Sequence, residues 1–271
     1  MNQQLFSILE SEGIQLLASI ALKDCEILRP YKLTKAGFSE GEELFATIFA
    51  IPYLTPAQNR NLSAYAVSRD YHIFFKQLFD TVIPKLEGAF PGYLFGGFAD
   101  DSPINEREAA ARAGLGIIGD NGLLITEKYS SYVFLGEIIT NLPIECKIGE
   151  IRRCEGCGRC KKACPMVTHG ECLSAITQKK GELTDEEKRL IIENGSVWGC
   201  DKCQECCPHT TNAIKNKTIY TDVEFFESNR ISNLTKDILD GMTREEFASR
   251  AYSWRGKSVI ARNLDILEKG D

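Results

Sequence analysis

Apolar runs separated by turn residues organise the first half of the chain. Residues 44–51 (LFATIFAI) are apolar except for Thr47 and end at Pro52, which predicts a buried strand. Residues 93–99, 123–126 and 132–140 predict three more strands, with a turn at 128–131. Residues 57–87 predict a long helix, whose apolar face carries Tyr71, Phe74, Phe75, Leu78 and Phe79. Residues 104–113 predict a second helix, which begins after Asp101-Ser102-Pro103 and ends at Gly114. This alternation favours an α/β sandwich.

The second half of the chain carries a different pattern. Cysteines dominate residues 146–211, where a charged helix at 184–194 interrupts them, and its Thr-Asp-Glu-Glu opening is typical of a helix start. Residues 243–250 and 257–268 predict two further helices. We therefore expect an α/β domain at 1–145, a cysteine domain at 146–215 and a helical segment at 216–271.

Composition narrows the class of protein. The 271 residues are 43% hydrophobic and 26% charged, as in a folded globular chain. The longest apolar stretch is far shorter than the about 20 residues of a membrane-spanning helix. The N-terminus has neither a basic region nor a cleavage site for secretion, so we expect a soluble, cytoplasmic protein. The net charge of −6 argues against broad nucleic-acid binding. We therefore expect neither DNA nor a membrane as partner.

Ten of the eleven cysteines lie between Cys146 and Cys207, and in a cytoplasmic chain such clustering indicates metal. The run Cys154-x2-Cys157-x2-Cys160-x3-Cys164-Pro165 has the spacing of bacterial ferredoxins, in which the fourth cysteine ligates the other cluster. A zinc site, the alternative, prefers two separated Cys-x2-Cys pairs. The spacing therefore favours iron–sulfur clusters.

A second run, Cys200-x2-Cys203-x3-Cys207-Pro208, repeats the tail of the first run position for position. By this symmetry one [4Fe–4S] cluster takes Cys154, Cys157, Cys160 and Cys207. The other takes Cys164, Cys200 and Cys203 and needs a fourth ligand. Cys172 is the better candidate, although Cys206 also continues a Cys-x2-Cys spacing. Electrons would pass from one cluster to the other, and the α/β domain should hold the group that finally receives them.

Several motifs together resemble the epoxyqueuosine reductase family, whose members are cobalamin-dependent iron–sulfur enzymes. Besides the first cysteine run, the motifs are Arg69-Asp70-Tyr71-His72, Asp100-Asp101-Ser102-Pro103 with Glu106-Arg107, Ala113-Gly114-Leu115-Gly116, Phe134-Leu135-Gly136-Glu137, Cys172-Leu173-Ser174 and Gly199-Cys200-Asp201-Lys202-Cys203-Gln204. They occur in the family's order over residues 44–210. The resemblance implies a cobalamin-binding α/β domain followed by a two-cluster ferredoxin-like domain. It also implies reduction of epoxyqueuosine in tRNA to queuosine.

The resemblance also implies roles for individual residues. Asp100 matches the family's proton donor, although a turn residue at a strand end is the alternative. Leu124, Leu135, Ser174, Cys200 and Asp201 match positions that line the corrin, whereas plain core packing competes for the two leucines. Tyr71 and His72 match a motif beside the active site. The implied cofactors are two [4Fe–4S] clusters and cobalamin, and the implied donor is an external protein of the ferredoxin or flavodoxin type.

The chain departs from the family pattern in ways that concern the substrate. It ends at Asp271, so we expect a short form without the C-terminal helical-repeat domain, and no basic segment precedes the first predicted strand. Asp120 stands where the family has a lysine, and His209 stands where an aromatic is usual. Reduction of epoxyqueuosine in tRNA, or of a smaller related substrate, is the first hypothesis. A non-catalytic electron carrier and a flavin in place of the corrinoid are the alternatives.

One stretch has the composition of a nucleic-acid contact. Residues 250–262 contain no acid before Arg262 and interleave four cations with two aromatics: Arg250, Arg255, Lys257 and Arg262 with Tyr252 and Trp254. The alternative is a set of arginines that bind elsewhere in the fold. The sequence is therefore compatible with a weak, salt-dependent contact with tRNA.

Overall fold

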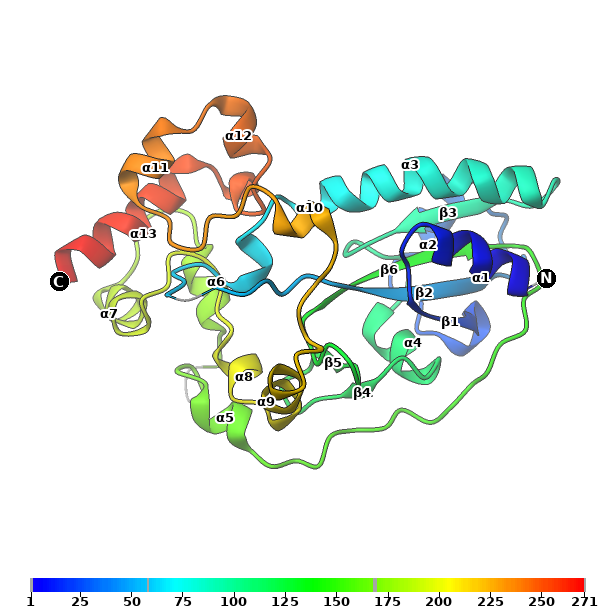
Figure 1. Cartoon of the computed structure of the whole chain (residues 1–271), viewed down its shortest axis with the longest axis horizontal. Coiled ribbons are helices and arrows are strands. Elements are labelled where there is room, and N and C mark those ends of the chain that lie inside the picture. The colour runs from blue at the N-terminus through cyan, green and yellow to red at the C-terminus, as the bar shows by residue number, and fades with distance from the viewer. Residues whose placement is uncertain (1, 58, 168–169, 271) are drawn as a thin grey trace. The chain divides into compact units, whose positions relative to one another are not determined.

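The computed structural model describes residues 2–57, 59–167 and 170–270 (Figure 1). The chain forms two compact units. The first unit comprises Met1–Pro52 and Phe74–Cys157, and the second comprises Tyr53–Ile73 and Gly158–Asp271. The C-terminal residues therefore pack in the same unit as most of the cysteines.

The first unit is built on an antiparallel sheet (Figure 1). Its strand order is β1 (Leu16–Ala21), β2 (Phe45–Pro52), β6 (Val133–Thr140) and β3 (Phe95–Phe98). A separate hairpin pairs β4 (Ile117–Ile118) with β5 (Leu124–Ile125). The four predicted strands are confirmed with small shifts at their ends. Strands β1 and β4 had not been predicted, although β1 is apolar except for Ser19.

Helices flank both faces of this sheet. On one face α3 (Tyr71–Ala89) lays Phe75 and Phe79 against glycines: a Cβ on Gly136 or on Gly97 would lie 2.4 Å from these rings. On the other face α4 (Glu106–Arg112) packs Ala109–Ala111 against β2 and β6. The remaining elements of this unit are α1 (Asn2–Ser11), η1 (Leu22–Asp24) and α2 (Pro30–Lys35). The prediction of a mixed α/β fold is confirmed.

Two of the predicted helix starts were wrong. The long helix begins at Tyr71 and not near residue 57, because the backbone before it bonds to another segment: Val197 N–H donates to Asn61 O at 2.7 Å, and Ser63 N–H donates to Trp198 O at 2.8 Å. The short η2 (Ala64–Ala66) lies within this stretch. Helix α4 is capped by Asn105, whose side chain accepts from Glu108 N–H, and not by Asp101 or Ser102.

The second unit is helical and has two apolar cores. Its elements are α5 (Arg159–Ala163), α6 (Leu173–Thr177), α7 (Asp185–Asn194), α8 (Lys202–Glu205), α9 (Pro208–Lys215), α10 (Glu224–Glu227), α11 (Lys236–Gly241), α12 (Arg244–Ala248), η3 (Ser253–Arg255) and α13 (Lys257–Gly270). Helix α13 serves both cores, with Leu264 in one and Ile266 in the other. Between them the buried Asn263 donates to Thr177 O at 2.7 Å and to Val197 O at 2.8 Å.

The predicted helices of the second half are confirmed as α7, α12 and α13. Thr184 and Glu187 form the capping box that the sequence indicated at the start of α7. Among the described residues, no helix is long and apolar enough to cross a membrane.

Candidate functional site

Several cysteines gather around one apolar core of the second unit. Cys164 and Cys200 both pack against the cluster that contains Met166 and Leu173. Cys172 directly precedes Leu173, as the N-terminal cap of α6. Cys203 lies in α8, whose residues contact those of α5. Residues from three separate segments thus approach the same core.

Cys172 and Cys206, the two candidates for the fourth ligand of the second cluster, have different surroundings in the structure. Burial raises the pKa of Cys200, and the neighbouring Cys172 thiol and Asp201 carboxylate raise it further. Cys172 and Cys200 are therefore neighbours, as one cluster would require. The Cys206 Sγ instead faces the backbone, where it donates to Cys203 O at 3.7 Å.

The first cysteine of the first run is held by the β4–β5 hairpin. Cys154 N–H donates to Ile118 O at 3.0 Å, and Asp120 N–H donates to the Cys154 Sγ at 3.3 Å. Hydrogen bonds to cysteine sulfurs are one way in which a protein tunes an iron–sulfur cluster. Asp120 therefore contributes its backbone amide to the surroundings of Cys154, and this contribution does not depend on its side chain.

Two cysteines outside the runs, Cys25 and Cys146, are half-buried thiols. Burial, chiefly, raises the pKa of Cys25 to about 12 and that of Cys146 to about 11. Both thiols are free cysteines. Within the described ranges, no three His, Cys, Asp or Glu side chains are arranged to hold a single metal ion.

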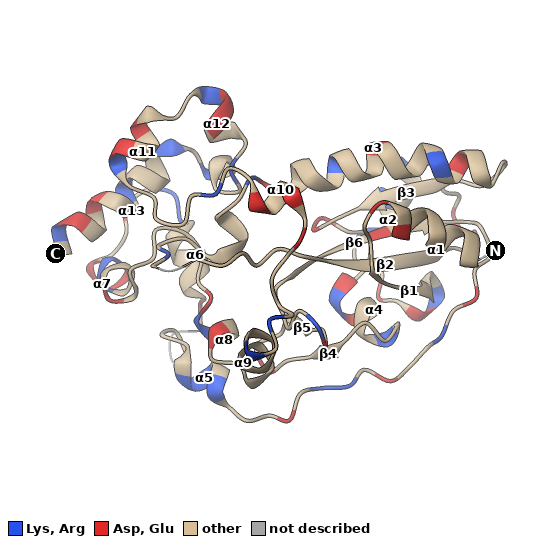
Figure 2. Cartoon of the chain, in the orientation of Figure 1, with Lys and Arg blue, Asp and Glu red and all other residues tan. Residues whose placement is uncertain are grey.

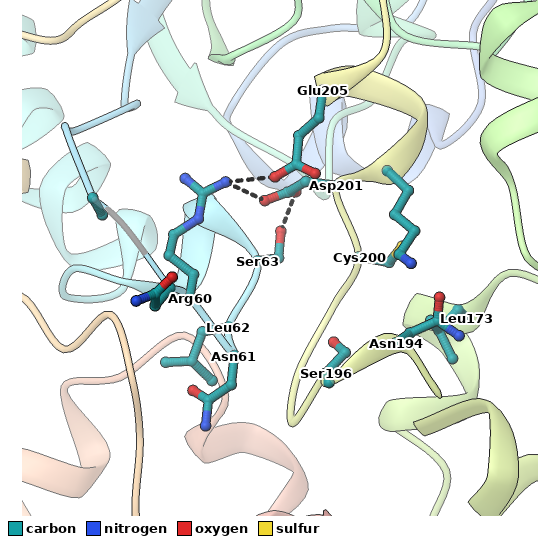
Figure 3. A pocket seen from close by; sticks show the side chains of 14 residues that line it. Arg60, Asn61, Leu62, Ser63, Leu173, Asn194, Ser196, Cys200, Asp201 and Glu205 are labelled. Atoms are coloured by element: carbon teal, nitrogen blue, oxygen red, sulfur yellow. Dashed lines mark hydrogen bonds and ion pairs between the residues drawn. The ribbon is translucent and has the colours of Figure 1, made fainter. Parts of the chain in front are cut away.

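A polar pocket of about 200 Å³ lies in the second unit beside Cys200 and Asp201 (Figure 3). Asp201 is only 6% exposed. Ser63 Oγ donates to its Oδ1 at 2.5 Å, Ala64 N–H donates to its Oδ2 at 2.6 Å, and Arg60 lies 3.5 Å from Oδ2. Burial raises the pKa of Asp201, while these three partners oppose the rise. Asp201 thus fixes one wall of the pocket.

Other residues complete the pocket. Arg60 also pairs with Glu205 at 2.9 Å, and Asn194 and Ser196 line the opposite side (Figure 3). The sequence had not indicated Arg60 or Ser63. Both lie in the stretch that was predicted as helix, so their position beside Asp201 could not be foreseen.

The other residues that were expected to contact the corrin are less accessible to a ligand. Leu124 and Leu135 are 3% and 9% exposed, and both belong to the apolar core of the first unit. Core packing, the alternative to a contact with the corrin, therefore accounts for the position of both leucines. Ser174 is half-buried in the second unit, where its Oγ accepts from Gln178 Nε2 at 3.0 Å.

Asp100 occupies an unusual backbone conformation in the first unit. Its φ is +64°, and Asp101 N–H donates to Ala99 O at 2.9 Å, so Asp100 is the central residue of a γ-turn. The positive-φ form of this turn is rare and strained. The Asp100 side chain is exposed.

Two carboxylates that the sequence analysis gave no role lie beside this turn. Burial, together with the Asp100 charge, raises the pKa of Glu106 to about 7. Glu137 is fully buried in β6, and its pKa is raised well above the ordinary value by burial and by Glu106. A glutamate inside an otherwise apolar strand was the signal in the sequence.

The Tyr71–His72 motif lies at the start of α3. The two rings stack with centroids 4.2 Å apart, and the His72 Nδ1 lies 2.8 Å from Asp70 Oδ1. Asp70 also accepts from His72 N–H at 2.9 Å, which caps the helix. The aspartate thus holds the imidazole at the helix end.

The basic aromatic stretch at 250–262 is mostly structural. Arg250 is buried and donates to Asn229 O at 2.6 Å, and Arg262 donates to Lys179 O at 2.8 Å. Tyr252 is fully buried. Trp254 is 60% exposed, with the Arg255 guanidinium 4.0 Å from its ring centre. The alternative of arginines engaged in the fold is therefore correct for Arg250 and Arg262.

Comparison of the coordinates with solved structures gives the class of fold. The epoxyqueuosine reductase of Streptococcus thermophilus matches with a TM-score of 0.74 at 23% identity, over 100% of this chain and 81% of that one. A structure of epoxyqueuosine reductase with an epoxyqueuosine-modified tRNA-Tyr stem loop matches with a TM-score of 0.75 at 24% identity, over 98% and 80%. The fold is that of these reductases. No protein-family model matches the chain.

Sequence relatives identify the family. The epoxyqueuosine reductase of Synechocystis is 30% identical over 230 residues, which cover 78% of this chain and 78% of that protein. The one from Listeria monocytogenes is 34% identical over 209 residues, 73% of this chain and 54% of that protein. The chain belongs to the epoxyqueuosine reductase family. It spans about half to two thirds of the length of the first curated relatives it matches.

Proposed function

We propose that this chain is an iron–sulfur reductase that acts on the epoxide of epoxyqueuosine, in tRNA or in a smaller related molecule. The proposal rests on family membership together with one observation: the exposed carboxylate of Asp100 on a strained turn. Backbone strain persists where the surrounding structure imposes it, and it concentrates at functional sites. A residue that only forms a turn at the end of a strand does not require a strained conformation.

The cysteines fit two [4Fe–4S] clusters in a ferredoxin-like segment within residues 146–215. Cys164 and Cys200 pack against one apolar core, and Cys172 directly precedes Leu173 of that core, which suits three ligands of one cluster. Cys203 would complete that set. Cys154, Cys157, Cys160 and Cys207 would hold the other cluster, where the Asp120 amide already donates to Cys154 Sγ. The clusters would supply electrons one at a time.

Cobalamin is the proposed second cofactor, and its reduced cobalt would supply the electrons to the substrate. The pocket beside Asp201 and Cys200 offers hydrogen-bonding side chains that suit the polar arms of a corrin (Figure 3). It is too small for the whole macrocycle. Ser174 follows Leu173 of the pocket lining and would extend this surface. The buried Leu124 and Leu135 would support the site through packing only.

Asp100 would supply the proton. Reducing an epoxide takes two electrons, and the oxygen released from the ring must gain a proton. An exposed carboxyl group on a fixed turn can deliver that proton from its Oδ atom to a bound substrate and regain one from solvent. An electron carrier without substrate would need no such group.

The test is turnover of an epoxyqueuosine-modified stem loop by the anaerobically purified chain with added cobalamin and a chemical reductant. We expect queuosine by mass spectrometry from the wild-type chain and none from Asp100→Asn, whose amide keeps the shape but cannot deliver a proton. The visible spectrum should show the same clusters in both proteins. Glu108→Gln on α4 is the matched control and should turn over normally.

Three outcomes would contradict the proposal. Turnover by Asp100→Asn at the wild-type rate would return Asp100 to a turn role. Intact clusters without turnover of either the stem loop or the free nucleoside would favour the electron carrier. A bound flavin spectrum that cobalamin does not alter would favour the flavin alternative.

A further inference from the structure

The loop that carries Asp100 lies between two paired stretches of backbone. Strand β3 ends at Phe98, and the next bridge along the described chain pairs Ile104 with Ile27. The φ of Asp100, +64°, lies in the left-handed region, which few residues other than glycine adopt. Such a conformation persists where the surrounding contacts impose it. The neighbours of the loop must therefore supply contacts that hold it.

The segment before α2 runs alongside this loop. The N–H groups of Leu28 and Arg29 both donate to Pro103 O, at 2.8 Å and 3.0 Å. Pro30 at the start of α2 favours this course, because the residue before a proline is pushed out of the helical region. Arg29 accordingly has φ −138° and ψ 74°. Backbone hydrogen bonds therefore fix the end of the loop at Pro103.

Two cations of the same part of the chain bind the two carbonyl groups before that point. Arg29 Nη1 donates to Ser102 O at 2.9 Å, and Lys32 Nζ donates to Asp101 O at 2.6 Å. Together with Pro103 O, three consecutive carbonyls of the loop thus accept hydrogen bonds from this part of the chain. A charged donor makes such a bond shorter and stronger than a neutral donor does. The two side chains therefore continue the hold on the loop toward Asp101.

The same cations also bind the side chain of Asp101. Its Oδ1 lies 3.1 Å from Arg29 Nε, and its Oδ2 pairs with Lys32, whose side chain is only 17% exposed. Arg29 therefore uses two nitrogens of its guanidinium, one on the Asp101 carboxylate and one on the carbonyl of the next residue. The two adjacent aspartates thus differ: Asp101 anchors the loop, whereas Asp100 is exposed at its turn.

We propose that Arg29 and Lys32 are positioning residues for Asp100. They fix the backbone and the carboxylate of Asp101, and so keep the residue before it in the left-handed conformation. Neither cation touches the substrate or exchanges a proton with it. The inference rests on the proposed function of Asp100 for its effect on turnover, whereas the hold on the loop is independent of that function. The alternative is that these partly exposed contacts only attach α2 to the surface and contribute little.

The first test measures amide hydrogen exchange in the anaerobically purified, cluster-loaded chain. In Arg29→Met the N–H groups of Asp101 and Ser102, which bond within the loop, should exchange about tenfold faster than in the wild type. Strands β3 and β6 should keep their wild-type exchange. Lys35→Met removes an exposed cation of the same helix and is the matched control, which should change nothing. Unchanged exchange in Arg29→Met, or in Lys32→Met where Arg29→Met does not fold, would overturn the proposal.

The second test compares kcat with KM for turnover of the epoxyqueuosine-modified stem loop. Arg29→Met should lower kcat about tenfold and change KM less than about twofold, because the cation acts through Asp100 and not on the substrate. Arg29→Lys keeps the charge but loses one of the two contacts, so its kcat should lie between those of Arg29→Met and the wild type.

Two kinetic outcomes would overturn the positioning role. A raised KM with unchanged kcat in Arg29→Met would assign Arg29 to substrate binding. Wild-type values of both constants would limit Arg29 to attaching α2. If the wild type does not turn over at all, the proposed function fails, while the exchange measurement still decides whether Arg29 and Lys32 hold the loop.

Discussion

The Ser63 hydroxyl donates a 2.5 Å hydrogen bond to Oδ1 of Asp201, which lies 138 residues further along the chain. The same carboxylate accepts from the Ala64 amide at 2.6 Å. One buried side chain thus joins the extended segment after β2 to the loop that carries Cys200, in the second unit. This link places the polar pocket beside a cysteine of the second run.

Asp201→Ala should lower the free energy of unfolding by about 3 kcal/mol, because it leaves the Ser63 hydroxyl, the Ala64 amide and Arg60 without their buried partner. Asp201→Asn should cost less, since its amide oxygen still accepts. Thermal unfolding of the anaerobic holoprotein measures both changes. Equal losses from the two variants would show that the charge, and not the hydrogen bonds, is what matters.

Stability should fall as pH rises through neutrality, and Glu106 should account for part of the fall. Its pKa is about 7 in the folded protein against 4.5 ordinarily, so its contribution is complete below about 4.5 and is lost as pH rises through about 7. The loss is at most about 3 kcal/mol. Thermal midpoints between about pH 5 and about pH 8 should vary less in Glu106→Gln than in the wild type. Parallel curves would contradict this assignment.

Iron content should separate Cys172 from Cys206. We expect about eight irons per chain, about half of them lost in Cys172→Ala, and nearly all retained in Cys206→Ala. The reason is that Cys172 neighbours Cys200, whereas the Cys206 thiol faces a backbone carbonyl. Anaerobic iron analysis and the visible spectrum measure this. The reverse result would favour the local Cys-x2-Cys spacing, and stoichiometric zinc would end the iron–sulfur proposal.

Any RNA contact of the 250–262 stretch should depend on Trp254 and Arg255, since Arg250, Tyr252 and Arg262 are engaged in the fold. Trp254→Ala should weaken binding of a tRNA stem loop about tenfold by loss of stacking. Tyr31→Ala removes a side chain that is 62% exposed in α2 and should have no effect. Filter binding over a range of salt measures both, and unchanged affinity in Trp254→Ala would exclude this surface.

Exposed basic residues surround the first cysteine run in an otherwise acidic chain, and α5 is blue in Figure 2. In α5 they are Arg159, Lys161 and Lys162. An acidic donor of the ferredoxin or flavodoxin type should dock here, because complementary charge speeds encounter. Reversing Arg159 and Lys162 to Glu should slow cluster reduction several-fold at low salt but not at high salt. Lys35→Glu in α2 is the control, and equal slowing by it would exclude a local docking site.

The sequence by itself determined the elements whose signals are local. The uninterrupted apolar run became β2, Thr184 and Glu187 formed the capping box of α7, and the cysteine spacing indicated clusters before any coordinates. Such signals depend on neighbours within a few residues, so they survive whatever the rest of the chain does.

Only the tertiary structure decided which distant residues meet. The long helix was predicted to begin near residue 57, yet the backbone of Asn61 and Ser63 bonds to residues 197–198 instead, which brings Ser63 to Asp201. Glu137 is one polar position in an apolar strand, and only the packing of α4 on that face of the sheet brings Glu106 close to it. The physical reason is that burial of a charge and backbone pairing are properties of the whole fold, which overrides local preference where the two conflict.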